Sequence, residues 1–123
     1  MKGKLYLRSF YEGIMENVIN INIARGNMNG IGNKLISLAP SPYLFKWYMD
    51  NKNSDNWFET YRKVYMNQLK GNTSSLNSLS NIRNLLDEGN DVCIYCFCRN
   101  VSKCHRGIVG DLFVAKGYEV IYK

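Results

Sequence analysis

The chain has 123 residues and a mass of 14.2 kDa, which is enough for one hydrophobic core and too little for two ordinary domains, so we expect a single domain over residues 1–123. Its net charge of +6 favours anionic partners, but Lys and Arg are spread along the chain, which ranks a nucleic-acid-binding protein below one that binds a small anion. No apolar run reaches the roughly 18 residues that cross a membrane, and the start "MKGKLYLRSF" lacks the apolar segment of a secretory signal, so the sequence predicts a cytoplasmic protein with no membrane partner.

Two strands are predicted near the N-terminus. Residues 4–10 alternate leucines with larger polar side chains, and residues 18–24 alternate isoleucines with asparagines. A period of two is typical of a strand that presents different residues to its two faces. A Gly- and Asn-rich stretch follows at residues 25–33, and a loop of this kind directly after a strand can bring backbone N–H groups close to a ligand.

Helices are predicted in the middle of the chain. Ser41 suits an N-cap and Pro42 a first helical turn, a second helix is expected to start at Asp55 and stop at Gly71, and a third ends at Gly89. The apolar residues of these last two helices fall at helical spacing, and we interpret them as a core-facing stripe rather than a cofactor site. They are Trp57, Tyr61, Val64, Tyr65 and Leu69, followed by Leu76, Leu79, Ile82, Leu85 and Leu86.

The C-terminal part predicts a βαβ unit. Residues 92–97 are almost continuously apolar, as expected for a parallel strand buried on both faces, and a helix from residue 104 and a strand at 118–123 follow. The predicted fold class is therefore α/β: a small three-layer Rossmann-like domain with a mostly parallel sheet and helices on both faces. Ligands of such sheets bind beyond the carboxyl ends of the strands. The sequence places Arg8 and Ser9, Arg25 and Gly26, and residues 96–105 at those ends.

The segment "CIYCFCRNVSKCHRG" at residues 93–107 holds all four cysteines and the only histidine. This crowding does not suit disulfide staples, and we expect reduced thiols. Cys96, Cys98, Cys104 and His105 offer the number and types of ligands that tetrahedral zinc or a soft iron site requires, although their spacing differs from that of common zinc knuckles. Cys93 is expected to lie in the core as a small apolar residue without a role.

Two other interpretations of this segment use no metal. Cys104 precedes the last helix, and the helix N-terminus would stabilise its thiolate, which makes it a candidate nucleophile with His105 as general acid or base. Arg106 or Arg25 would then hold a phosphate or carboxylate. Alternatively, the basic residues, the Gly-rich loop and the helix N-terminus form an anion-binding pocket that carries out no reaction.

The chain resembles the family known as domain of unknown function 488 in four stretches: "IARG", "LAPS", "YRKVYMNQL" and "CIYCFCRNVSKCHRGIVGDLF". The likeness runs from about residue 5 to residue 122, and Cys-His-Arg at the head of the last helix is its most specific element. The resemblance implies a Rossmann-like fold and a site formed by Ser9, Arg25, Cys96, Cys104, His105 and Arg106, with Arg62 as a weaker member. Where the family commonly has a glutamate, this chain has Cys98, which shifts the site toward soft metals or redox chemistry, or away from catalysis.

Relatives found in phages and in bacterial defence neighbourhoods imply a nucleotide-derived ligand and a location in the cytoplasm of a bacterium or a phage-infected cell. Our leading hypothesis is a protein that binds an anionic, nucleotide-derived small molecule, with Cys104 and His105 available for a hydrolase or transferase step. The second is a Cys3His module for zinc or iron. The third is a non-enzymatic phage counter-defence protein that sequesters a nucleotide immune signal.

Overall fold

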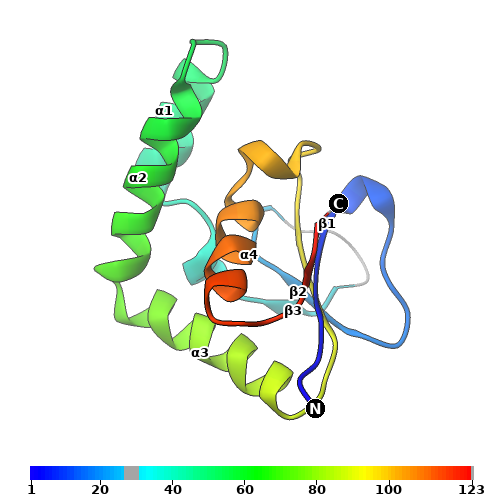
Figure 1. Ribbon diagram of the computed structural model, residues 1–123. Helices are drawn as coiled ribbons and strands as arrows, with labels where there is room; N and C mark the ends of the chain where they lie inside the picture. Colours follow the sequence, from blue (N-terminus) through cyan, green and yellow to red (C-terminus); the bar gives the residue numbers. More distant parts are fainter. Residues whose placement is uncertain (27–30, 123) are drawn as a thin grey trace.

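The computed structural model describes residues 1–26 and 31–122 as a five-stranded parallel sheet with α-helices packed against it (Figure 1). The strands are β1 (Leu5–Ser9), β2 (Ile19–Asn22), β3 (Asn33–Lys34), β4 (Val92–Cys96) and β5 (Val120–Ile121), in the order β3-β2-β4-β1-β5. The helices are α1 (Pro42–Asn51), α2 (Trp57–Lys70), α3 (Thr73–Asp87) and α4 (His105–Ala115), with short 3-10 turns η1 (Phe10–Glu12), η2 (Ile36–Leu38) and η3 (Val101–Lys103). The prediction of a Rossmann-like α/β domain with a parallel sheet is confirmed.

The sheet is centred on β4, which pairs with β1 on one side and with β2 on the other. All five residues of β4 are buried, as its continuous apolar sequence predicted. The predicted βαβ unit is also present, but β4 and β5 are not neighbours, because β1 lies between them. The strand order depends on which edges pair across the whole chain, and the local sequence pattern carries no signal for it.

One face of the sheet packs on the helices. Leu5, Leu7, Ile21 and Ile94 project to this face and form one apolar core with residues of all four α-helices. A Cβ on Gly110 of α4 would lie 2.6 Å from Leu7 Cδ1, so this helix lies directly on β1. Ser41 caps α1 by accepting a hydrogen bond from the Leu44 N–H, as the sequence predicted.

The opposite face is covered differently from the helical layer that we expected. There the turn η1 and the following segment up to residue 18 pack over the sheet. Phe10 belongs to a second apolar cluster on this face and Met15 packs against that cluster. The other members of the second apolar cluster are Ala24, Cys93, Tyr95, Cys96 and Cys104. The Tyr95 hydroxyl donates to Asn20 Oδ1 at 2.6 Å and accepts from the Met15 N–H at 2.9 Å. Because this face carries polar groups that need hydrogen-bond partners, a loop with free backbone groups suits it better than an apolar helix would.

Three further local details differ from the sequence-based expectations. The second helix begins after Asn56, which has a left-handed backbone (φ 58°), rather than at Asp55. Leu76 is 46% exposed and not part of the core stripe of α3. The short strand β3 begins at the last residue of the Gly- and Asn-rich stretch 25–33, of which residues 27–30 lie outside the described residues.

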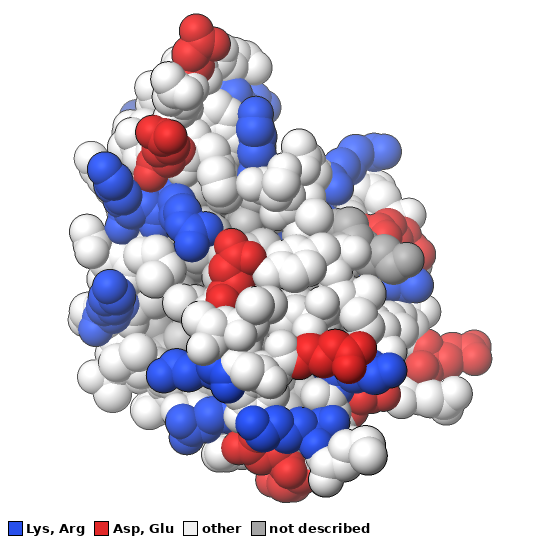
Figure 2. Space-filling view, in the orientation of Figure 1, with Lys and Arg blue, Asp and Glu red and all other residues white. Residues whose placement is uncertain are grey.

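The charged side chains on the face shown in Figure 2 are interspersed, with Lys and Arg beside Asp and Glu over most of the visible surface. This agrees with the spread of basic residues along the sequence, and nucleic acid binding stays a lower-ranked prediction. Among the described residues no helix has the length and apolar character needed to cross a membrane.

Candidate functional site

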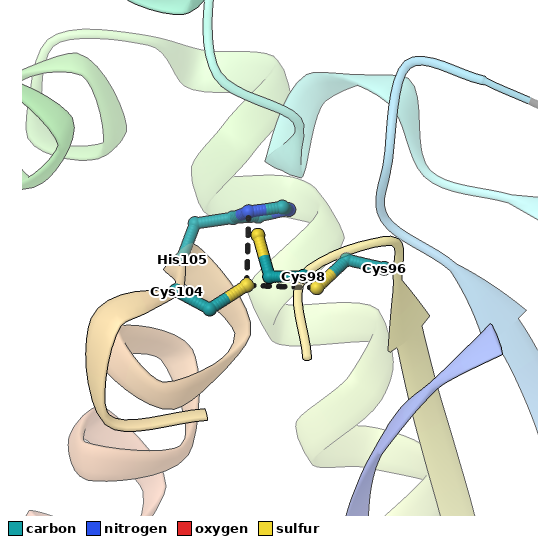
Figure 3. A group of neighbouring side chains, drawn as sticks. All are labelled: Cys96, Cys98, Cys104 and His105. Carbon is teal, nitrogen blue, oxygen red and sulfur yellow. Dashed lines mark hydrogen bonds between the residues drawn. The ribbon is translucent and has the colours of Figure 1, made fainter. Parts of the chain in front are cut away.

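Three thiols and one imidazole converge where β4 ends and α4 begins (Figure 3). Cys96 is the last residue of β4, Cys98 lies in the loop that follows, and Cys104 is the N-cap of α4, whose first residue is His105. One possible ligand atom of each residue lies within 4.8 Å of those of the other three. The four residues that the sequence singled out as metal ligands therefore form one cluster, which we call the Cys/His centre.

The loop between β4 and α4 is short and held by local contacts. Asn100 caps the turn η3 by accepting a hydrogen bond from the Ser102 N–H through Oδ1 at 3.1 Å. The first turn of α4 then packs tightly on η3, because Gly107 has no side chain: a Cβ there would lie 2.2 Å from the Val101 carbonyl oxygen. This close approach brings Cys104 back to the end of β4.

The imidazole of His105 is oriented by the neighbouring strand segment. Its Nε2 donates to the Ile23 carbonyl oxygen at 2.8 Å, so in the neutral ring the lone pair lies on Nδ1. Nδ1 in turn lies 3.7 Å from Cys104 Sγ, on the side of the sulfurs (Figure 3). The ring is 4% exposed and makes an edge contact with Tyr65. A backbone carbonyl on the second ring nitrogen is the arrangement that fixes histidine ligands in metal sites.

Arg106 lies behind the cluster and is fully buried. Its guanidinium donates to Cys96 Sγ at 2.9 Å, to the Cys98 carbonyl oxygen at 2.6 Å and, at a longer 3.5 Å, to Cys104 Sγ. A buried positive charge needs a nearby negative one, and a thiolate in the centre supplies it. Arg106 therefore acts on the sulfurs from inside the protein, and it does not line the cavity from which a ligand would approach.

The thiols of the centre differ in their ionisation. Burial opposes the ionisation of Cys96, but hydrogen bonds from Cys104 and Cys98 and the charges of His105 and Arg106 outweigh it and hold the pKa of Cys96 well below its usual range. Burial and the neighbouring Cys96 raise the pKa of Cys104 well above that range. For Cys98, the hydrogen bond with Cys104 acts to lower the pKa. The hydrogen bond between Cys98 and Cys96 and the burial of Cys98 outweigh this and raise the pKa of Cys98 to about 12. Without a metal, the shared negative charge is therefore centred on Cys96.

The Cys/His centre opens into a cavity of about 390 Å³, which we call the ligand pocket. Cys98, Cys104 and His105 line it on one side, and the charged residues Arg25 and Lys103 also contribute to its wall. The remainder of the wall is apolar, and aromatic rings make up most of it. These other lining residues are Ala24, Gly26, Pro40, Phe45, Tyr48, Trp57, Tyr61 and Phe97.

Some residues predicted for the site lie at the pocket. Arg25 lines the pocket and its Nε donates to the Pro40 carbonyl oxygen at 2.6 Å. Gly26 lies against Phe97, since a Cβ on Gly26 would be 2.6 Å from that ring. The Asn22 side chain holds this segment through the Ala24 N–H and the Gly26 carbonyl oxygen.

Other predicted residues lie elsewhere. Ser9 pairs with Cys96 across the sheet, but its side chain accepts a hydrogen bond from the Tyr11 N–H as the cap of η1, and it does not line the ligand pocket. Arg62 forms an exposed ion pair with Asp111 at 3.1 Å, at a different surface hollow. Cys93 is buried in the second apolar cluster, which agrees with its expected place in the core.

The sequence interpretation missed the aromatic wall. In α2 the predicted core stripe holds for Tyr65 and Leu69, which are buried in the main core, but Trp57 and Tyr61 also line the ligand pocket. Helical periodicity shows which residues share a face, and it cannot show where that face extends beyond the core. The only available signal was Phe97, an aromatic residue between two candidate metal ligands.

The fold and the Cys/His centre define a small Rossmann-like α/β protein with a thiol-rich site at the carboxyl edge of its sheet. Residues 16–117 match the family described as DUF488-N3a, the active DUF488-N3 subclade, and because this match spans most of the chain, the protein belongs to the DUF488 family. The family resemblance seen in the sequence is thereby confirmed. Comparisons with curated proteins and with solved structures gave no match.

Proposed function

We propose that Cys96, Cys98, Cys104 and His105 bind one zinc or iron ion at the side of the ligand pocket. The observation that carries this proposal is the convergence of the four ligand atoms within 4.8 Å. Around tetrahedral zinc, with Zn–S near 2.3 Å and Zn–N near 2.0 Å, ligand atoms lie about 3.5–3.8 Å apart. The sulfurs of Cys96 and Cys104 are 2.8 Å apart and would separate by about 1 Å to take this geometry.

The chemistry around the centre supports a bound cation. Three sulfurs and one imidazole are the soft and borderline ligands that zinc and iron prefer. His105 already presents Nδ1 toward the sulfurs because Ile23 accepts a hydrogen bond from Nε2. Three sulfurs close together cannot all ionise without compensating charge, and when His105 is neutral, as a metal ligand must be, Arg106 supplies one positive charge against three negative ones. A divalent metal would supply the rest, and because four protein ligands fill a tetrahedral shell, it would hold the end of β4 and the start of α4 together as a closed structural site.

The test of this proposal is the metal content of the protein purified under reducing conditions without added metal. Native mass spectrometry and elemental analysis should find one zinc or iron per chain. Separate Cys96→Ser and Cys104→Ala variants should lose it. The matched control is Cys93→Ala, which removes a buried thiol outside the centre and should keep the metal. A folded, reduced wild-type protein without metal, which also fails to bind added zinc, would overturn the proposal.

A second candidate function is the capture of an anionic small molecule, which the sequence-based hypothesis described as nucleotide-derived. Arg25 and Lys103, both on the wall of the ligand pocket, favour it. In its enzymatic form Cys104 acts as the nucleophile and His105 as the proton carrier, and in its non-enzymatic form the protein sequesters the ligand. In metal-free protein the raised pKa of Cys104 and the lowered pKa of Cys96 favour the thiolate on Cys96, so a Cys104 nucleophile requires His105 to take its proton before it attacks.

The two forms differ in the fate of a retained ligand. Mass spectrometry after denaturation should detect any small molecule that co-purifies. An unaltered molecule that is released slowly would support sequestration, whereas a changed product would support a reaction. If a reaction is found, Cys104→Ser should abolish turnover and leave binding largely intact. Equal loss of binding and turnover would argue against Cys104 as nucleophile.

A further inference from the structure

The aromatic wall of the ligand pocket has two parts that come from separate units of the fold. Phe45 and Tyr48 lie on α1 and Trp57 lies on α2, so the helical hairpin supplies one part. Phe97 follows β4 and supplies the other part from the edge of the sheet. In Figure 1 this hairpin extends beyond the carboxyl edge of the sheet, where the loop after β4 also lies. The rings that line the pocket therefore come from two separate units of the fold.

The rings are preorganised, and two of them stay accessible. Tyr48 contacts Trp57 with ring centroids 5.1 Å apart, and Phe97 packs on Phe10 at 4.6 Å, so ring contacts hold both parts of the wall. Yet Phe45 is 45% exposed and Phe97 38% exposed. Large aromatic side chains that line a cavity and stay this exposed offer a binding surface for an apolar, flat group.

The polar groups of the pocket select the charge of the ligand. Arg25 and Lys103 are the charged side chains among the described lining residues, and no carboxylate accompanies them there. The hydrogen bond from Arg25 Nε to Pro40 fixes one edge of its guanidinium. Lys103 directly precedes Cys104 in the sequence, and both residues line the ligand pocket. A phosphate is the anion that such a pair of cations binds well.

We infer that the ligand pocket binds a nucleoside phosphate, with its base stacked between Phe97 and the rings of α1 and α2 and its phosphate held by Arg25 and Lys103. A sugar phosphate would use the cations and leave the rings uncovered, and a neutral aromatic compound would do the reverse. A cavity of about 390 Å³ suits a ligand with one base, one sugar and one phosphate. This inference deepens the second candidate function, and it rests on the same pocket but not on the presence of the metal.

The test uses the full-length protein as purified and isothermal titration calorimetry. The probes are the four ribonucleoside monophosphates, with adenosine as the phosphate-free comparison and ribose 5-phosphate as the base-free comparison. At least one monophosphate should bind, and its binding should be about tenfold or more tighter than that of either fragment, because stacking and charge neutralisation both contribute. The Phe45→Ala variant should weaken nucleotide binding by about tenfold. Its control is Tyr43→Ala on the same helix, which removes a ring that is 76% exposed and does not line the pocket.

Each outcome decides part of the inference. Ribose 5-phosphate binding as tightly as the nucleotides would overturn the stacking role of the rings, and adenosine doing so would overturn the role of the cations. No binding by any of the four monophosphates would overturn the inference as a whole, as would equal effects of the two alanine variants. The metal content of the same samples separates this result from the metal proposal: metal-loaded protein without nucleotide binding refutes only the inference, and nucleotide binding by protein that cannot take up metal refutes only the metal centre.

Discussion

Two glycines of α4 allow a direct test of how the fold positions the Cys/His centre. A Cβ on Gly107 would lie 2.2 Å from the carbonyl oxygen of Val101, which belongs to η3. A Cβ on Gly110 would lie 2.6 Å from Leu7 Cδ1, the far end of a flexible side chain. Gly107 lies in the first turn of α4 and Gly110 in the second, so each alanine substitution gains at most about 1 kcal/mol of helix propensity. They differ in whether the obstructing atom can move.

The Gly107→Ala substitution must push η3 away from α4, because a backbone carbonyl cannot rotate aside as a side chain can. Because the obstructing atom is part of the backbone, we place the cost in the upper part of the range for overpacking, about 2–3 kcal/mol, against a propensity gain of at most about 1 kcal/mol. We therefore expect a net loss of about 1–2 kcal/mol of unfolding free energy, or roughly 3–8 °C in melting temperature for a chain of this size. Displacing η3 also moves Cys104 from Cys96, so metal affinity should fall. Gly110→Ala should cost less than Gly107→Ala, because the atoms that its Cβ would meet, in Leu7 (2.6 Å), Val120 (3.3 Å) and Tyr122 (3.4 Å), all belong to side chains, which shift more readily than a backbone carbonyl.

The measurements are thermal melts by circular dichroism and competitive zinc titration with a chromogenic chelator. If the Gly107→Ala variant bound zinc with wild-type affinity, the close contact between η3 and α4 would not be what positions Cys104. Equal destabilisation by the two variants would show that backbone and side-chain obstruction are not distinguishable at these positions.

Two further substitutions test the charge in the centre and the second face of the sheet. Arg106→Met removes the buried guanidinium that donates to Cys96 Sγ. Breaking a buried charge pair lowers the unfolding free energy by about 3–5 kcal/mol, and we expect this loss in chelator-treated protein. The loss should be smaller in metal-loaded protein, because the metal also compensates the thiolate. Thermal melts with and without chelator would measure this loss of stability, with Arg99→Met as a control at an exposed position. An identical loss in both states would contradict the idea that Arg106 and the metal both compensate the Cys96 thiolate. Tyr95→Phe removes the hydroxyl that bonds Asn20 and Met15, which should cost about 1–3 kcal/mol in urea unfolding and leave metal content unchanged. Loss of metal in this variant would show that the second face also supports the centre.

Local patterns determined much of this protein. The period of two at residues 18–24, the apolar run that became β4 and the Ser41-Pro42 cap each act within a few residues of the chain, so the elements could be predicted from the sequence. Because β4 and α4 are joined by a short connection, Cys96, Cys98, Cys104 and His105 were also expected near one another at the carboxyl edge of the sheet.

Only the tertiary structure decided what surrounds these residues. Contacts between segments far apart in the sequence set the order of the strands and the buried position of Arg106. The structure also shows that Ser9 and Arg62 lie away from the ligand pocket. The aromatic wall is the clearest case, because helical spacing places Trp57 and Tyr61 on one face but does not say whether core, solvent or a cavity lies opposite. Periodicity is a property of one element, whereas a binding site is formed by the distances between several elements.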